Sequence, residues 1–281
     1  MADDLTASLQ IEEEVGPNRY RFPGPPEGRG VVFGGHLLAQ MCVAGARADS
    51  GKLVRSAHGI FARSVRADEP YELQVDVLHA GRVLASATVS VWQGGSERAR
   101  GLVMLTSVEP DLIRHQATAP LISRPGDTPA VEDPYGRQVR IVDGLDRGDP
   151  DVVAPPRLSV WMRFDAAPPE PVVGQALVTH ATAGFLMGTT MLPHPGVGER
   201  LAHRDFSTGI IAHTISFHDD VDPQRWMLIT QESTHTGRGR AYGVGQVFTE
   251  EGTMVASFTQ EAIMRPFPEG HSPDGRESTV L

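Results

Sequence analysis

Hydrophobic and polar positions alternate along the chain in two successive blocks of similar design. Residues 37–46 contain one strongly polar side chain, Gln40, and they follow the pair Gly34-Gly35. A helix that is apolar all round has no face for solvent, so we predict a helix here that is wrapped by the sequence after it. That sequence shows the period-two alternation of strands over 55–63, 71–78, 83–92 and 99–106. The pattern predicts an antiparallel meander curled around one helix.

The second block repeats this order. A nearly apolar helix is predicted from Pro171, a good first helical residue, and the prolines at 193 and 195 stop it. Strand patterns return at 210–218, 227–233, 239–248 and 253–264.

An ungapped shift relates the two blocks. Sliding the chain by 155 residues (212 − 57 = 155) places Ala57-His58 on Ala212-His213 and Val89 on Val244. Such internal similarity indicates a duplication. We therefore predict two like domains joined sheet to sheet, with both helices on the same side of one long sheet.

Composition gives the domain boundaries. Between residues 109 and 156 the chain carries eight prolines, a charged patch and no sustained periodicity, which predicts a linker that wraps the surface. The stretch from 19 to 30, rich in proline and glycine, predicts an irregular connector. The expected organisation is an N-terminal domain at 1–108, a linker at 109–157, a C-terminal domain at 158–266 and a mobile tail at 267–281.

Bulk properties exclude several classes of protein. A chain of 281 residues with 40% apolar side chains can form two cores. The net charge of −10 argues against a nucleic-acid partner. The acidic N-terminus does not resemble a secretory signal, and no apolar run is long enough to span a membrane. We expect a soluble, cytoplasmic protein without a membrane partner, in which the single cysteine, Cys42, is a buried spectator.

Several motifs, in order, resemble one known family. They are VFGG at 32–35, LVxSxHxxFxR at 53–63, HxxxFH at 213–218, EST at 232–234 and VASxxQExxMR at 255–265. Together these resemble the type II acyl-CoA thioesterases. The resemblance implies an α+β double hotdog fold and hydrolysis of acyl-CoA to a fatty acid and coenzyme A. It implies no cofactor apart from the coenzyme A of the substrate.

The same resemblance assigns three positions to the attacking water. In the family an Asp on the second helix, a Thr on the strand after it and a Gln on the last strand hold this water. The matching residues here are Ala183, Ile210 and Gln260. Thr182 and Thr208 stand one and two residues away from the first two, and neither is a base. One of the three family groups is therefore present.

Two explanations of the missing carboxylate stay open. Another residue can serve as base: His36 at the start of the first helix, or His58 or His213, for which a satisfied structural role is the alternative. Otherwise the protein binds acyl-CoA without hydrolysing it quickly.

Hydrolysis without a covalent intermediate also needs hydrogen-bond donors for the developing oxyanion. A helix opened by Gly34 and Gly35 presents free N–H groups, although close packing alone also explains the two glycines. Three arginines, Arg63, Arg66 and Arg238, are candidates for the phosphates of coenzyme A, with a solvated surface as the alternative.

Other chemistries fit less well. The sequence has no G-x-S-x-G nucleophile elbow, and the glycines at 237, 239 and 243 have the wrong spacing for a dinucleotide loop. We expect no metal, because His213 and His218 face opposite sides of a strand. The leading hypothesis is an acyl-CoA thioesterase, followed by a catalytically weak acyl-CoA-binding protein and, last, a hydratase acting on enoyl-CoA. We expect a homo-oligomer, because joined sheets leave edges and flat faces to cover.

Overall fold

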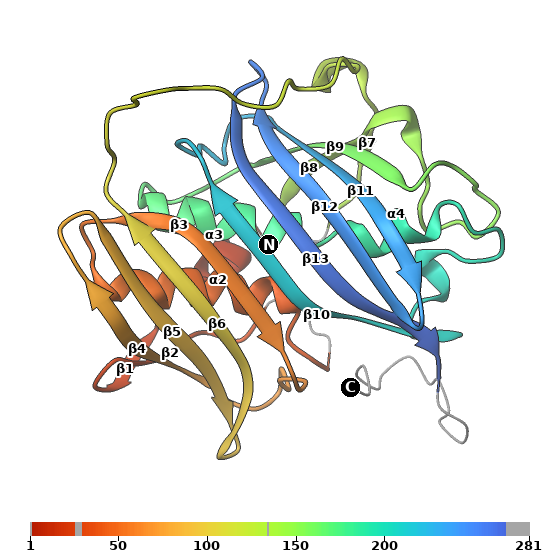
Figure 1. Ribbon diagram of the computed structural model, residues 1–281. Coiled ribbons are helices and arrows are strands. Elements are labelled where there is room, and N and C mark those ends of the chain that lie inside the picture. The colour runs from red at the N-terminus through yellow and green to blue at the C-terminus, as the bar shows by residue number, and fades with distance from the viewer. Residues whose placement is uncertain (1, 26–29, 134, 268–281) are drawn as a thin grey trace.

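A single antiparallel sheet with two central helices on one side forms the body of the molecule (Figure 1). The computed structural model describes residues 2–25, 30–133 and 135–267. In this part of the chain the sheet has 13 strands in the order β1-β2-β4-β5-β6-β3-β10-β13-β12-β11-β9-β8-β7. All of the predicted tail except residue 267 lies outside the described residues, as do residues 26–29 of the predicted connector.

The N-terminal half contains two α-helices, a short 3₁₀-helix (Ala46–Ala48) and six strands among the described residues. In chain order the α-helices and strands are α1 (Ala2–Ser8), β1 (Glu13–Gly16), β2 (Arg19–Arg21), α2 (Gly34–Gly45), β3 (Leu53–Phe61), β4 (Glu72–Ala80), β5 (Leu84–Gln93) and β6 (Ser96–Thr106). The remaining α-helices and strands are β7 (Ala130–Val131), β8 (Arg137–Ile141), β9 (Arg157–Phe164), α3 (Pro171–Thr182), α4 (Leu186–Met191), β10 (Phe206–Phe217), β11 (Met227–Gly237), β12 (Arg240–Thr249) and β13 (Met254–Pro266).

The two halves meet at the middle of the sheet. Strand β3 pairs antiparallel with β10, from Ser56 opposite Ser216 to Ile60 opposite Ala212. Each half thus contributes its own meander to one continuous sheet, and α2 and α3 lie together on the same side of it (Figure 1). The predicted double hotdog fold is confirmed.

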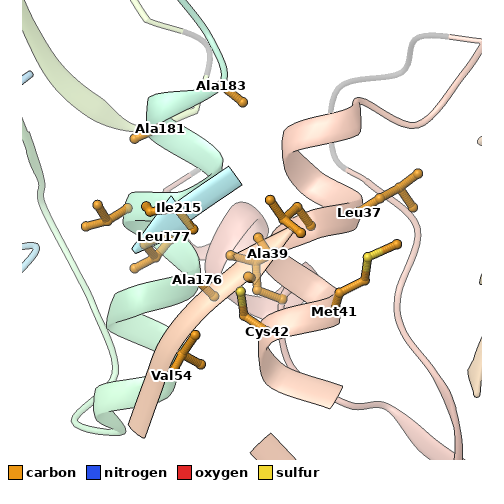
Figure 2. Close-up of a cluster of buried hydrophobic side chains, with 14 of the residues drawn as sticks. Leu37, Ala39, Met41, Cys42, Val54, Ala176, Leu177, Ala181, Ala183 and Ile215 are labelled. Atoms are coloured by element: carbon orange, nitrogen blue, oxygen red, sulfur yellow. The ribbon is translucent and has the colours of Figure 1, made fainter. Parts of the chain in front are cut away.

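The two apolar helices pack against each other along their lengths. Figure 2 shows Ala39 and Cys42 of α2 beside Ala176 and Leu177 of α3, and all four are buried. The Cys42 Sγ lies 3.8 Å from the Thr179 Oγ1. Burial raises the pKa of the Cys42 thiol to about 12, so the thiol is inert at neutral pH.

Two hydrogen bonds also connect the halves. The Gln175 side chain of α3 accepts a hydrogen bond from the Val54 N–H (3.0 Å) and donates one to the Val54 C=O (2.8 Å). Val54 adjoins an irregularity in the β3–β6 pairing, between Val54 and Ser56. The amide of one half therefore satisfies backbone groups of the other half where the strand ladder is interrupted.

The structure departs from the predicted pattern in four places, one of which is the eight-residue strand β9, absent from the predicted strands. The apolar segment that begins at Pro171 forms two helices and not one: α3 ends at Thr182, and α4 starts at Leu186. The predicted linker contains β7 and β8, and β8 pairs with β9. Strands β1 and β2 add an edge next to β4. These edge strands have two to five residues, which is too short to show a periodic signal.

The internal repeat is also out of phase at the central strands. Directly opposed residues share a face of the sheet, and the pairs are Thr214 with His58 and His213 with Gly59. His58 and His213 therefore point to opposite faces, although the shift of 155 residues aligns them. His213 is buried on the helix side, whereas the His58 Nδ1 is bonded to the Thr214 Oγ1 at 2.7 Å. A one-residue difference in register is enough, because side chains in a strand alternate with period two.

Candidate active site

A cavity of about 1350 Å³ opens between the two halves. One wall comes from the start of α2 and the end of β3, and another comes from the end of α3, α4 and the start of β10. The third wall is the predicted linker, so this segment does more than cover the surface. The lining residues used below are Gly34, Arg63, Asp133, Tyr135, Arg137, Asp146, Arg147, His180, Gly184, Phe185, Glu199, Arg200, His203, Thr208 and Ile210.

The start of α2 forms one end of this cavity. The residue before the helix, Phe33, makes no side-chain cap, and its carbonyl accepts hydrogen bonds from the N–H groups of His36 and Leu37. The N–H groups of Gly34 and Gly35 belong to the first turn, which has no acceptor within its own helix. Gly34 lines the cavity. Positive helix-dipole charge and two such donors make this end suitable for an oxygen that gains negative charge.

The end of α3 lies directly against the start of α2. A Cβ atom placed on Gly35 would be 2.6 Å from the Cβ of Ala183, and one placed on Gly34 would be 3.4 Å from the Cβ of Ile210. The two positions that the family resemblance assigns to water binding, Ala183 and Ile210, thus adjoin the glycine-opened helix end. Both side chains are apolar and buried.

A polar cluster lies under the last turn of α3. The Thr182 Oγ1 is 3.0 Å from the His213 Nε2 of β10, and His213 stands opposite Gln260 of β13 in the strand pairing. All three side chains are buried, with 0–1% of their surface exposed. Neither amide atom of Gln260, nor the Nδ1 of His213, has a well-formed hydrogen bond to any described residue. The structure therefore brings together three residues that the sequence analysis considered, Thr182, His213 and Gln260.

Burial sets the protonation of this cluster. It lowers the pKa of His213 from 6.5 to about 4, and the neighbouring Gln260 carboxamide opposes this effect. The imidazole is consequently neutral at pH 7, and one of its ring nitrogens carries a lone pair.

The other two polar candidates lie apart from this cluster. Thr208 lines the cavity, and its Oγ1 is 3.2 Å from the His203 Nε2. His36 is fully buried, and its Nε2 is 3.1 Å from the Nε2 of Gln40. Gln40 lies one turn further along α2, so its side chain is on the same helix face. The His36 ring points into this core network and is not among the residues that line the cavity.

The three candidate arginines have different settings. Arg63 lines the cavity. Arg66 is exposed and forms ion pairs with Asp68 and Glu69. Arg238 is exposed at the turn between β11 and β12, where it has a φ of 52°. Neither Arg66 nor Arg238 lines the cavity.

The sequence reasoning missed the polar wall formed by the linker. The Arg137 guanidinium makes two hydrogen bonds to Asp133, at 2.9 and 2.6 Å, and lies 4.7 Å from the Tyr135 ring. His180 packs edge-on against the same ring at 5.0 Å. Burial and, to a smaller extent, the Arg137 charge lower the pKa of His180 to about 3. The only early signal was the alternating sequence of β8, which is five residues long.

Metal coordination has no support in the described residues, where no group of three or more His, Cys, Asp or Glu side chains is arranged to hold an ion.

Comparison with protein families places both halves in one group. Residues 22–106 match the N-terminal domain of acyl-CoA thioesterases, and residues 116–264 match the C-terminal domain. The chain is 22% identical over 257 residues to acyl-CoA thioesterase 2 of Haemophilus influenzae, covering 83% of this chain and 87% of that protein. It is 24% identical over 268 residues to mouse acyl-coenzyme A thioesterase 8, covering 85% and 81% of the two chains.

Solved structures agree with this grouping. An acyl-CoA thioesterase II from Mycobacterium marinum superposes with a TM-score of 0.78 at 27% identity, over 96% of this chain and 99% of that one. A tesB protein from Mycobacterium avium subsp. paratuberculosis has the same fold, with a TM-score of 0.82 at 22% identity, over 95% of this chain and all of the other.

Proposed function

This chain belongs to the acyl-CoA thioesterase family, and we propose that it hydrolyses acyl-CoA by attack of an oriented water, releasing a fatty acid and free coenzyme A. One observation carries this mechanism. The glycine-opened start of α2 meets the end of α3 at the wall of a large cavity, and the buried carboxamide of Gln260, which neighbours His213, lies under that end.

Each group has a distinct task in this mechanism. The N–H groups of Gly34 and Gly35 bind the thioester oxygen as it becomes negative. Gln260 orients the attacking water with its carboxamide. The leaving thiol has a pKa near 8.5, so the reaction needs no strong general acid. Thr182 and Thr208 add hydroxyl groups at the end of α3 and at the cavity wall.

The charged surroundings suit the rest of the substrate. Arg63, at the cavity, is our first candidate for a phosphate of coenzyme A, and Arg66 and Arg238 are candidates for phosphates that extend beyond the cavity. We propose no cofactor and no metal besides the coenzyme A of the substrate.

The cellular setting is also part of the proposal. No helix among the described residues has the length and apolar character needed to cross a membrane. We propose that the protein acts in the cytoplasm, in fatty acid metabolism, as a homo-oligomer without nucleic-acid or membrane partners.

A second function receives support from one residue. Ala183 can neither accept a proton nor polarise water, and it packs against Gly35. If no other group takes its place, the protein is an acyl-CoA-binding protein with weak catalysis.

Release of free thiol from acetyl-, octanoyl- and palmitoyl-CoA distinguishes these functions. We expect turnover by the natural protein and a large loss in Gln260→Ala. Activity that appears only in Ala183→Asp would identify the binding protein instead. Full turnover in Gln260→Ala would overturn the assigned role of the carboxamide.

A further inference from the structure

We propose that His213 accepts the proton of the attacking water and that Thr182 positions its ring. The inference rests on the proposed hydrolysis. In this proposal His213, on strand β10, is the base that replaces the carboxylate missing at Ala183.

The ring lies in the right part of the molecule. Its Nε2 is 3.0 Å from the Oγ1 of Thr182, the residue immediately before Ala183. Ala183 in turn contacts Gly35 at the start of α2. The imidazole therefore contacts the residue next to this junction, on the buried side of the cavity wall, since Thr182, His213 and Gln260 are not among the residues that line the cavity.

The hydrogen bonds of Thr182 favour one tautomer of His213. The Thr182 Oγ1 is also 3.0 Å from the carbonyl oxygen of Thr179, which can only accept. The single hydroxyl hydrogen satisfies that carbonyl, so the Nε2–H of His213 donates to the hydroxyl oxygen. The Nδ1 of His213 consequently carries a lone pair.

The Gln260 carboxamide is close enough to His213 to act on its charge as a hydrogen-bonding neighbour. Nδ1 and both amide atoms of Gln260 lack a well-formed hydrogen bond to the described protein while fully buried. Each such group costs about 1–3 kcal/mol of stability. A donor, an acceptor and a base on two neighbouring side chains form the set that a single water needs, with Gln260 orienting it and His213 taking its proton.

Other candidates for the base are already engaged. Three carboxylates that line the cavity form ion pairs with arginines: Asp133 with Arg137, Glu199 with Arg147 and Asp146 with Arg200. A fourth, Glu132, is exposed on the linker wall.

The other histidines near the site are also held by neighbours. His203 is bonded to Thr208 and His36 to Gln40. His180 is packed against the Phe33 and Tyr135 rings.

The step balances without a co-reactant. The water oxygen bonds to the thioester carbon while one water proton moves to Nδ1, and the carbonyl electron pair moves to the oxygen bound by Gly34 and Gly35. The C–S bond then breaks with its electron pair on sulfur. The proton leaves Nδ1 for the thiolate or for solvent, which restores the neutral ring.

The environment of His213 keeps it proton-accepting. Thr182 faces it from α3, Gln260 and Phe258 from β13, and Gly59 from β3, and none of these carries a charge. The titratable group that acts on it is His58 on the opposite face of β3, which lowers its pKa. The resulting pKa of about 4 is similar to that of an ordinary aspartate, near 3.9.

The experiment compares His213→Gln with His58→Gln in the full chain, using octanoyl-CoA and the release of free thiol. The two histidines align in sequence but face opposite sides of the sheet, so His58→Gln is a matched control. We expect kcat to fall by about 10²- to 10⁴-fold in His213→Gln with KM unchanged, and we expect natural rates in His58→Gln. Natural kcat in a folded His213→Gln would overturn the inference and leave the hydrolysis proposal intact. No turnover by the natural protein would overturn both.

If His213→Gln does not fold, a second pair of variants tests whether Thr182 positions the His213 ring. Thr182→Val removes the hydroxyl but keeps the shape, and Thr182→Ser keeps the hydroxyl. We expect Thr182→Val to lower kcat about tenfold and to move the acid limb of kcat/KM, which we expect near pH 4 in the natural protein from the lowered pKa of His213. Thr182→Ser should retain both properties. Equal kcat and equal pH profiles in the two variants would overturn the positioning role.

Discussion

The Cα of Gly35 lies so close to Ala183 that a Cβ atom on the glycine would be 2.6 Å from the alanine Cβ. This contact joins the start of α2 to the end of α3. It brings the oxyanion donors of one half next to the polar cluster of the other half. The site therefore exists only because the two halves are packed together.

Substitution of this glycine tests the contact. In Gly35→Ala the new methyl group would also lie 2.6 Å from the Cε1 of Phe33, so the helices must move apart. We expect a loss of about 1–3 kcal/mol of unfolding free energy and a fall in kcat, measured by urea unfolding and thiol release. Gly34→Ala is the comparison, because its nearest contacts are at 3.3 Å. Equal effects of the two substitutions would contradict this account.

Gln260→Met should separate stability from activity. The methionine fills a similar volume and removes two buried polar atoms that have no well-formed bond to described residues. We expect the unfolding free energy to rise by about 1 kcal/mol while thiol release is lost. A less stable Gln260→Met protein would instead indicate that the carboxamide has a structural role.

Acid should destabilise the fold through two of its buried histidines, His180 and His213. The pKa values of His180 and His213 are lowered to about 3 and about 4, whereas an unfolded histidine titrates near 6.5. Below pH 6.5 the unfolded chain binds protons that the folded chain does not, so stability is present above this pH and is lost as the pH falls. Each histidine contributes a slope of about 1.4 kcal/mol per pH unit between its two pKa values.

His180→Phe checks this prediction. The variant should show a shallower loss of unfolding free energy between pH 6 and pH 4, by roughly 1.4 kcal/mol per pH unit, in denaturant titrations at each pH. An unchanged slope would show that His180 is protonated in the folded state.

Removal of one partner of the Asp133–Arg137 ion pair, in the cavity wall formed by the predicted linker, should lower the unfolding free energy strongly. The side chains of Arg137 and Asp133 are 4% and 9% exposed. Asp133→Ala leaves a buried guanidinium unpaired, for which we expect a loss of about 3–5 kcal/mol in unfolding free energy. The double variant with Arg137→Met should recover most of this loss. Additive effects of the two substitutions would show that the pair is not coupled.

Local patterns revealed much of the fold in advance. The apolar run after Gly34-Gly35 gave α2, and alternation gave the strands from β3 to β6 and from β10 to β13 to within a few residues. Edge strands of two to five residues carried too little pattern, so β1, β2, β7 and β8 were missed, and the eight-residue β9 was also absent from the predicted strands. The sequence shift also aligned His58 with His213, although the strand register places them on opposite faces.

The sequence by itself determined that two apolar helices must each be covered by a meander, because such helices have no face that water can solvate. It also identified Gln260 and the glycines at the start of α2 through the motifs around them. The tertiary structure alone decided that Thr182, His213 and Gln260 meet, that His36 turns toward Gln40, and that the linker completes the cavity. These contacts depend on strand register and on packing between distant segments, and a register difference of one residue reverses the direction of a side chain.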